Sequence, residues 1–416
     1  MREYRYPIEY EELADAGRPL RIAAVTETYP PEVNGVATSA ARMLEGLCGR
    51  GHQVQLIRPR QDPGDLGAAR AGLEQVLVRG LPIPRYPALK MGLPAKRALL
   101  ELWTYRRPDV VHIVTEGPLG WSALKAACKL KLPVVSDFRT NFHAYSSHYG
   151  VGWLKKPILA YLRKFHNRTL ATMVPTEALR AQLAALGFRG LRVIARGIDT
   201  VLFHPGRRDP LLRSEWKAAP DDPVLLYVGR LAPEKNLELL ATAYGEARRR
   251  TPSARLVVVG DGPGRALLQR WFPDAVFAGT RKGEDLARHF ASADVFIFPS
   301  MTETYGNVTL EAMASGLAVI AFDYAAAGEV IRHGVDGVLA AYGDAASFIS
   351  QAATLTGDLE RVRRLGCEAH LQAAGRGWGA VVQELETVLV AAAAMLPAVA
   401  LQGRFQQQDR RAFSPL

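Results

Sequence analysis

The sequence predicts an α/β protein with two doubly wound domains that face a central cleft, and three observations indicate this fold class. Short apolar segments alternate with longer amphipathic segments along most of the chain, a pattern typical of parallel sheets covered by helices. The 416 residues exceed what one ordinary hydrophobic core encloses. The alternation stops in the proline-rich segment 201–222 and then starts again, so we expect a linker there.

The first domain is expected over residues 19–200, after an N-terminal extension of residues 1–18. Its strands are expected at Arg21–Thr26, Gln53–Arg58, Val110–Val114, Val134–Phe138 and Thr172–Pro175. Helices are expected between them at Val36–Arg50, Gly120–Lys131 and Glu177–Gly187. Because helices separate successive strands, the strands are expected to pair in parallel.

The second domain is expected over residues 223–375 and repeats the same pattern. Its strands are expected at Val224–Val228, Leu256–Gly260, Val276–Ala278, Val295–Phe298 and Ala318–Ala321. Its helices include Leu237–Arg250 and Gly264–Trp271. Residues 376–400 are rich in alanine and are expected to form a C-terminal helix, whereas the polar tail 401–416 is expected to be disordered.

Charge and cysteine content limit the classes of partner. The net charge is +11, and the segment Gly117–Thr176 holds nine Lys or Arg residues but a single acid, Asp137. Such a patch attracts phosphates, nucleic acid or anionic lipid. No nucleic-acid-binding module accompanies it, so nucleic acid is not an expected partner. Three widely separated cysteines, no signal peptide and no membrane-spanning run indicate a cytoplasmic protein without a disulfide framework.

Two glutamates eight positions apart, Glu303 and Glu311, are the main functional indication. Glu303 is expected in a loop after the apolar run Val295–Pro299, and Glu311 about two turns into the helix that follows. Between them, Gly306 and Asn307 leave backbone N–H groups available at the helix start, where a diphosphate can be held. This element offers carboxylates for hydroxyl groups and a helix N-terminus for phosphate, and a nucleotide-sugar has both.

Loops after other expected strands supply cations and glycines. Arg230 and Lys235, which follow Gly229, are expected to neutralise a leaving diphosphate, although alone they could be solvated loop cations. The turn that contains Gly260 and Gly262 lacks the spacing of the dinucleotide fingerprint. It can be a nucleotide contact or a purely structural turn.

Two loops of the first domain are also candidates. In the segment 30–36, Asn34 and Gly35 permit a backbone conformation that turns amide groups toward the cleft, although an ordinary strand-to-helix turn would look the same. The segment that follows the strand Val134–Phe138 carries Arg139, Asn141 and His143, which could meet a sugar or be structural.

The segment 153–168 is expected to be an amphipathic helix. Trp153, Ile158, Tyr161, Leu162 and Phe165 fall on one face, and basic residues lie around the rest. The helix could lie on an anionic membrane, its apolar stripe could pack on its own domain, or both could hold if only the basic flank meets lipid.

Other chemistries lack their motifs. The chain contains no Asp-x-Asp, no Gly-x-x-x-x-Gly-Lys-Ser/Thr and no Gly-x-Ser-x-Gly. Handling of the phosphates by Arg230 and Lys235 without a metal ion is the consistent expectation, and no cofactor is expected.

Together these features resemble the retaining glycosyltransferases of the GT-B type, with two Rossmann-like domains, in glycosyltransferase family 4. The resemblance extends from about Arg21 to Gly375. Its landmarks, in chain order, are the Pro-Pro-x-x-Asn-Gly-Val loop, Gly197-Ile198-Asp199 with Phe203 and Pro205, Gly229-Arg230-Leu231 through Lys235, Gly260-Asp261-Gly262-Pro263 and the Glu-x7-Glu element. Two departures are Arg139, where many relatives carry His, and Arg196, where relatives often carry Asn.

The resemblance implies roles by position. Glu303 would bind donor-sugar hydroxyls and Glu311 the ribose, while Arg230 and Lys235 stabilise the departing diphosphate. The nearby donor-binding positions would be Gly35, Gly229, Gly260, Gly262, Tyr305, Gly306, Asn307 and Val308. Either His143 would serve as the catalytic histidine in place of the family residue, or Arg139 would add a phosphate or acceptor contact there. Asn34, Arg139 and Asn141 would face the acceptor or sugar. The C-terminal helix would cross back to the first domain.

Within the family, the stretches around Asn141 and Glu303 most resemble GDP-mannose-dependent α-mannosyltransferases that act on lipid-linked or glycolipid acceptors at the cytoplasmic membrane face. UDP-glucose or UDP-galactose transfer to diacylglycerol is the near alternative. Two alternative hypotheses come from other functional classes: a sugar-nucleotide epimerase of the same architecture and a non-catalytic binding protein. An intact set of Arg230, Lys235, Glu303 and Glu311 argues against the binding protein.

Overall fold

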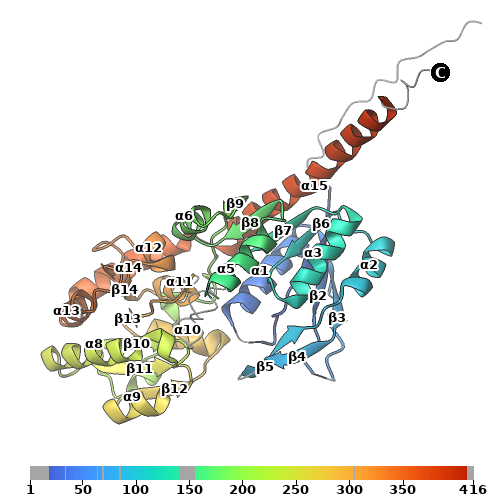
Figure 1. Cartoon of the computed structure of the whole chain (residues 1–416). Helices are drawn as coiled ribbons and strands as arrows, with labels where there is room; N and C mark the ends of the chain where they lie inside the picture. The colour runs from blue at the N-terminus through green and yellow to red at the C-terminus, as the bar shows by residue number, and fades with distance from the viewer. Residues whose placement is uncertain are drawn as a thin grey trace, which may run out of the picture.

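The computed structural model describes residues 18–32, 34–62, 64–67, 70–83, 86–139, 155–303 and 305–409, with side chains for all but 83, 86–89, 155 and 396–409. Two parallel α/β domains lie side by side, and the last helix, α15, extends from the second domain along the first (Figure 1). The expected fold class, two Rossmann-like domains, is confirmed by this architecture.

The N-terminal sheet has seven strands in the order β3-β2-β1-β6-β7-β8-β9, and its pairs run parallel. The strands are β1 (Arg21–Val25), β2 (Gln53–Pro59), β3 (Leu73–Val78), β6 (Val110–Ile113), β7 (Val134–Asp137), β8 (Ala171–Val174) and β9 (Leu191–Val193). The helices are α1 (Gly35–Gly49), α2 (Lys96–Tyr105), α3 (Pro118–Leu130), α5 (Lys155–His166) and α6 (Glu177–Ala185). A separate antiparallel hairpin joins β4 (Gly80–Ile83) to β5 (Tyr86–Gly92).

The C-terminal sheet has six parallel strands in the order β12-β11-β10-β13-β14-β15. The strands are β10 (Val224–Val228), β11 (Arg255–Val259), β12 (Val276–Gly279), β13 (Val295–Phe298), β14 (Ala318–Phe322) and β15 (Val338–Ala340). The helices are α8 (Leu237–Arg250), α9 (Arg265–Trp271), α10 (Gly283–Ser292), α11 (Asn307–Ala314), α12 (Ala325–Val330), α13 (Ala345–Thr356) and α14 (Leu359–Ala374). The central strands β10 and β13 are entirely buried, as their unbroken apolar sequence predicts.

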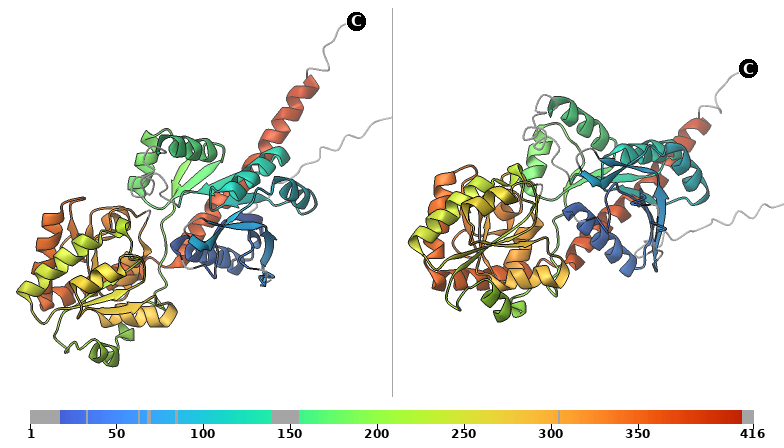
Figure 2. Two further views of the ribbon diagram at one scale, coloured as in Figure 1. Left: turned by 60° about the horizontal axis from the view of Figure 1, so that its bottom comes forward. Right: turned by 90° about the horizontal axis from the view of Figure 1, so that it is seen from below.

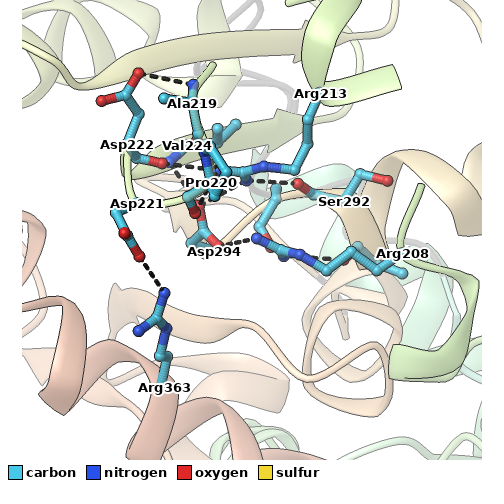
Figure 3. Close-up of polar contacts among 12 residues, drawn as sticks. Arg208, Arg213, Ala219, Pro220, Asp221, Asp222, Val224, Ser292, Asp294 and Arg363 are labelled. Carbon is cyan, nitrogen blue, oxygen red and sulfur yellow. Dashed lines mark hydrogen bonds and ion pairs between the residues drawn. The ribbon is translucent and has the colours of Figure 1, made fainter. Parts of the chain in front are cut away.

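Residues 201–222, predicted as a linker, are instead part of the C-terminal domain. They form the short helices η2 (Pro205–Arg207) and α7 (Pro210–Glu215), and Phe203, Leu212 and Trp216 are buried in that domain's core. Arg213 is 5% exposed and donates hydrogen bonds to Asp294 Oδ2 at 3.0 Å and to the carbonyl of Ser292 at 2.9 Å (Figure 3). These contacts hold the segment on the domain, because a buried guanidinium needs its partners in place.

The C-terminal helix crosses back to the first domain. Helix α15 covers Trp378–Asp409, so the helix continues through residues 401–409 of the tail that was expected to be disordered. Val382, Leu385 and Leu389 are buried in the N-terminal core beside residues of α1. Figure 2 shows α15 running along the N-terminal domain and past its edge. Over Trp378–Met395 the helix is long and apolar enough to cross a membrane, but its buried residues belong to this core.

Candidate active site between the domains

The carboxyl ends of the two parallel sheets meet where the domains touch, which is where α/β folds bind ligands. The loop after β1 leads to Gly35 at the start of α1, and the loop after β13 leads to Asn307 at the start of α11. A Cβ atom at Gly35 would lie 3.3 Å from Asn307 Nδ2. The two helix N-termini therefore meet in the interdomain site, by which we mean Gly35, Arg196, Lys235, Glu303 and Asn307 with their neighbours.

Lys235 and Glu303 are in direct contact. The Lys235 ammonium forms an ion pair with Glu303 Oε1, and the hydroxyl of Ser300 donates to the same oxygen at 2.7 Å. Burial alone would raise the pKa of Glu303, but Lys235 and the Ser300 hydroxyl outweigh it and lower the pKa below its ordinary value. Glu303 is thus held as a carboxylate, the form that accepts hydrogen bonds from sugar hydroxyls.

Arg230 is held by a carboxylate of its own loop. Its guanidinium pairs with Glu234, whose side chain is fully buried and whose carbonyl accepts a hydrogen bond from Thr302 Oγ1 at 2.9 Å. The Arg230 side chain is 39% exposed, so it lies at the edge of the site, whereas Lys235 is 12% exposed. Both predicted phosphate-binding cations therefore already pair with carboxylates.

Gly260 and Gly262 have a packing role in this structure. A Cβ at Gly260 would lie 2.0 Å from the carbonyl oxygen of Gly229, and one at Gly262 would lie 2.5 Å from that of Leu231. The backbone φ angles are +132° and +152°, a region that favours glycine. The turn thus presses against the Gly229–Leu231 loop and holds it in place. Contact of Gly229, Gly260 or Gly262 with the donor stays a prediction.

The start of α11 presents backbone amides, as the sequence suggested. Gly306 precedes the helix with φ 95°, and no side chain in the described part of the chain caps the N-terminus. Tyr305 is buried beside it, and Asn307 and Val308 form the first turn. An uncapped N-terminus of this kind can bind phosphate oxygens through the amides of this turn.

Glu311 lies about one turn into α11, which begins at Asn307, so the prediction of two turns was wrong. The helix begins where the sequence predicted, and Glu311 comes only four positions after Asn307, which is about one turn. Burial raises the pKa of Glu311 to about 7. The carboxyl group is therefore partly protonated near neutral pH.

A pH dependence follows from Glu311. If its carboxylate binds the ribose hydroxyls, affinity for GDP-mannose should rise about tenfold between pH 6 and pH 8, because the ionised fraction rises about tenfold across a pKa near 7. Calorimetric titration with GDP-mannose measures this, since its phosphates do not titrate in that range. Glu311→Gln should flatten the profile. A flat wild-type profile, or an equally steep variant profile, would exclude this role.

The predicted residues of the first domain have mainly structural contacts. The Oδ1 atom of Asn34 caps α1 by accepting from the amides of Val36 and Ala37 at 3.1 and 2.8 Å, which commits this side chain to the helix. Arg139 is 4% exposed and pairs with Asp137. Burial would raise the pKa of Asp137, but Arg139 and His112 hold it at about 2. Asn141 and His143 lie outside the described residues.

The sequence reading gave no role to two residues of the interdomain site. Tyr324 donates from its hydroxyl to the carbonyl of Glu303 at 3.0 Å and supports the loop. Arg196 donates to Asn307 Oδ1 at 3.0 Å from a position 111 residues away. The departure from the family pattern at Arg196, just before Gly197, was the available signal.

The fold and this site together define a glycosyltransferase of the GT-B type. Residues 33–202 match the family described as Glycosyltransferase Family 4, and residues 222–358 match Glycosyl transferases group 1. A GDP-mannose-dependent alpha-mannosyltransferase of Mycobacterium tuberculosis is 35% identical over 369 residues, which cover 88% of this chain and 95% of that protein. Sulfoquinovosyl transferase SQD2 of Arabidopsis thaliana is 30% identical over 387 residues, covering 90% and 74%. The chain belongs to glycosyltransferase family 4.

Solved structures agree on the fold. HepE of Anabaena, in complex with UDP and glucose, superposes with a TM-score of 0.70 at 18% identity and covers 89% of this chain and all of that one. Sucrose-phosphate synthase of Thermosynechococcus elongatus gives a TM-score of 0.72 at 18% identity, covering 90% of this chain and 100% of that one. Identities this low show the shared architecture and nothing finer.

Proposed function

We propose that this glycosyltransferase transfers mannose from GDP-mannose to a hydroxyl of a lipid-linked or glycolipid acceptor, with retention of anomeric configuration and without a metal ion. The main support for this proposal is the contact between Lys235 and Glu303 beside the uncapped start of α11. In the proposal, Glu303 is the carboxylate that binds the sugar, Lys235 is the cation that binds the diphosphate, and the helix N-terminus beside them binds phosphate oxygens. Relatives of 34–35% identity bear the name GDP-mannose-dependent alpha-mannosyltransferase.

The proposed reaction breaks the bond between the anomeric carbon and the diphosphate and forms one from that carbon to the acceptor oxygen on the same face. The acceptor proton passes to an oxygen of the departing diphosphate, so GDP and the mannoside are the products. Lys235, Arg230 and the N-terminus of α11 would stabilise the negative charge that develops on the diphosphate. Glu303 would hold the mannose hydroxyls in position.

The acceptor class is supported by other relatives. An alpha-monoglucosyldiacylglycerol synthase of Streptococcus pneumoniae is 28% identical, and a phosphatidylinositol monomannoside mannosyltransferase of Mycobacterium tuberculosis is also 28% identical. These names favour a lipid acceptor. Because one of these relatives is named a monoglucosyldiacylglycerol synthase, the alternative is transfer from UDP-glucose or UDP-galactose to diacylglycerol.

A transfer assay tests the proposal. The purified protein would be given GDP-mannose, UDP-glucose or UDP-galactose in EDTA, with diacylglycerol, a glycosyldiacylglycerol or phosphatidylinositol in detergent micelles. The proposal expects a mannolipid from GDP-mannose alone, with an α-anomeric proton by NMR. Transfer only from a UDP-sugar would establish the alternative, and transfer that requires added metal would refute metal independence.

We further propose that helix α5 brings the enzyme to an anionic membrane at the cytoplasmic face. Leu162 and Phe165 are buried, so the apolar stripe packs on its own domain, while Lys156 and Lys164 are exposed. Docking would therefore be electrostatic. The double variant Lys156→Glu/Lys164→Glu should weaken binding to phosphatidylglycerol vesicles at low salt by at least about tenfold.

A matched control removes the same charge elsewhere. Arg270→Glu/Arg364→Glu changes two exposed basic residues of the C-terminal domain. Vesicle sedimentation should show near-wild-type binding for this control. Equal losses in both double variants would mean that net charge, not α5, governs binding, and no loss in the α5 variant would rule out α5 as the docking surface.

A further inference from the structure

Arg196 lies at the junction where the chain passes between the domains. It follows β9, and the next two residues run beside the returning chain: a Cβ at Gly197 would lie 2.7 Å from Trp378 Cα, and Ile198 donates to the carbonyl of Arg376 at 3.0 Å. The backbone of Arg196 is therefore fixed by both interdomain segments. Its side chain projects from this junction into the interdomain site.

The guanidinium of Arg196 bridges the two helix N-termini. Nη1 donates to Asn307 Oδ1 at 3.0 Å and to the carbonyl of Gly35 at 3.4 Å, and the guanidinium carbon lies 5.6 Å from the ring centre of Tyr305. Arg196 is only 5% exposed, yet its Nε is buried and has no hydrogen-bond partner among the residues that the structure describes. A donor group of a buried cation is thus left available in the site.

Arg196 forms no direct ion pair with a described carboxylate, although the charges of Asp137 and Glu303 favour its charged form from a longer distance. Arg230 pairs with Glu234 and Lys235 with Glu303, whereas no described carboxylate forms an ion pair with Arg196. Burial and the nearby Arg139 lower the pKa of Arg196 to about 9, because together they outweigh the opposite effect of Tyr305, Asp137 and Glu303. The N-termini of α1 and α11 also carry positive partial charge. A buried cation in such surroundings is costly unless an anion joins it.

We propose that Arg196 is a diphosphate-binding residue of the donor site. It reaches this site from the interdomain junction rather than from the C-terminal domain. This inference rests on the proposed function, since it assigns the anion as the donor's diphosphate. Arg196 contacts α1 and α11 at once, so an anion bound to it draws both N-termini toward the same phosphates. Donor binding would in this way favour the apposition of the two domains.

The test separates the diphosphate from the nucleoside. Arg196→Ala should weaken GDP binding by about tenfold to a hundredfold, the loss expected for one charged hydrogen bond, and leave guanosine binding unchanged. Isothermal titration of wild type and variant with both ligands measures this. Arg196→Lys keeps a cation in place and should recover part of the GDP affinity, which a purely structural role would not predict.

The matched control is Arg42→Ala. Arg42 pairs with Asp199 at 2.5 Å near the same junction, and its side chain is 43% exposed. It should bind GDP and guanosine as wild type does, so a loss shared by both variants would assign the effect to domain packing and overturn the inference. Equal GDP affinity in wild type and Arg196→Ala would overturn it as well. Failure of wild type to bind any nucleoside diphosphate would overturn the proposed function and this inference together.

Discussion

Glu303→Gln should lower the rate of mannosyl transfer by about a hundredfold to a thousandfold while the protein stays folded. The amide keeps the size of the side chain and an oxygen for the Ser300 hydroxyl, but it removes the charge that faces Lys235 and one acceptor for the sugar. Glutamine is preferred to alanine because Glu303 and Lys235 are only 15% and 12% exposed. Alanine would also remove the side chain that pairs with the largely buried Lys235 ammonium, and the loss of a buried ion-pair partner is itself destabilising.

Initial rates with GDP-mannose, paired with thermal unfolding curves, measure this effect. Glu284→Gln is the control, because that glutamate is 78% exposed on α10 and outside the interdomain site. The control should transfer mannose at the wild-type rate. A Glu303→Gln enzyme within threefold of wild type would exclude Glu303 from the reaction, whatever the stability of the variant.

Leu385→Asp should destabilise the N-terminal domain by about 3–5 kcal/mol. Leu385 is fully buried on α15, within the N-terminal core and beside α1, so the substitution buries a charge without a partner. Because α15 belongs to the C-terminal end of the chain, this result would show that the first domain depends on that end for its core. Urea unfolding followed by tryptophan fluorescence measures the loss, and reduced soluble expression is expected with it.

Val390→Asp on the same helix is the matched control. Val390 is 41% exposed, so its replacement should change the free energy of unfolding by less than about 0.5 kcal/mol. If both variants unfolded at the same urea concentration as wild type, α15 would not contribute to the N-terminal core. Equal destabilisation by both would point to lost helicity rather than lost packing.

The buried parts of the fold could be predicted because their sequence is distinctive. Strands β10 and β13 have the bounds that the sequence predicted, since a short unbroken apolar run between loops is typical of a buried strand. The edge strands β3, β9 and β15 were missed because they are short or half exposed and mix polar with apolar residues. Residues 201–222 were wrongly predicted to be a linker, because their prolines and charges are typical of one. Leu212 and Trp216 within this segment are nevertheless buried.

The sequence predicted those residues of the candidate site that come shortly after the carboxyl end of a strand. Lys235 and Glu303 are 68 residues apart, yet both follow the carboxyl ends of parallel strands, so their meeting could be expected. Arg196 could not be placed in this way. Its partners Gly35 and Asn307 lie 161 and 111 residues away and belong to different domains. Only the arrangement of the two domains brings them together.

The most direct test of the proposed activity is a comparison of GDP, UDP and ADP as stabilisers against thermal unfolding, in EDTA. We expect GDP to raise the unfolding temperature more than either of the others, because a GDP-mannose enzyme without a metal requirement binds this product in its donor site. Selective stabilisation by UDP would contradict the choice of GDP-mannose and favour a UDP-sugar donor. No stabilisation by any nucleotide would contradict a functional donor site between Lys235, Glu303 and α11.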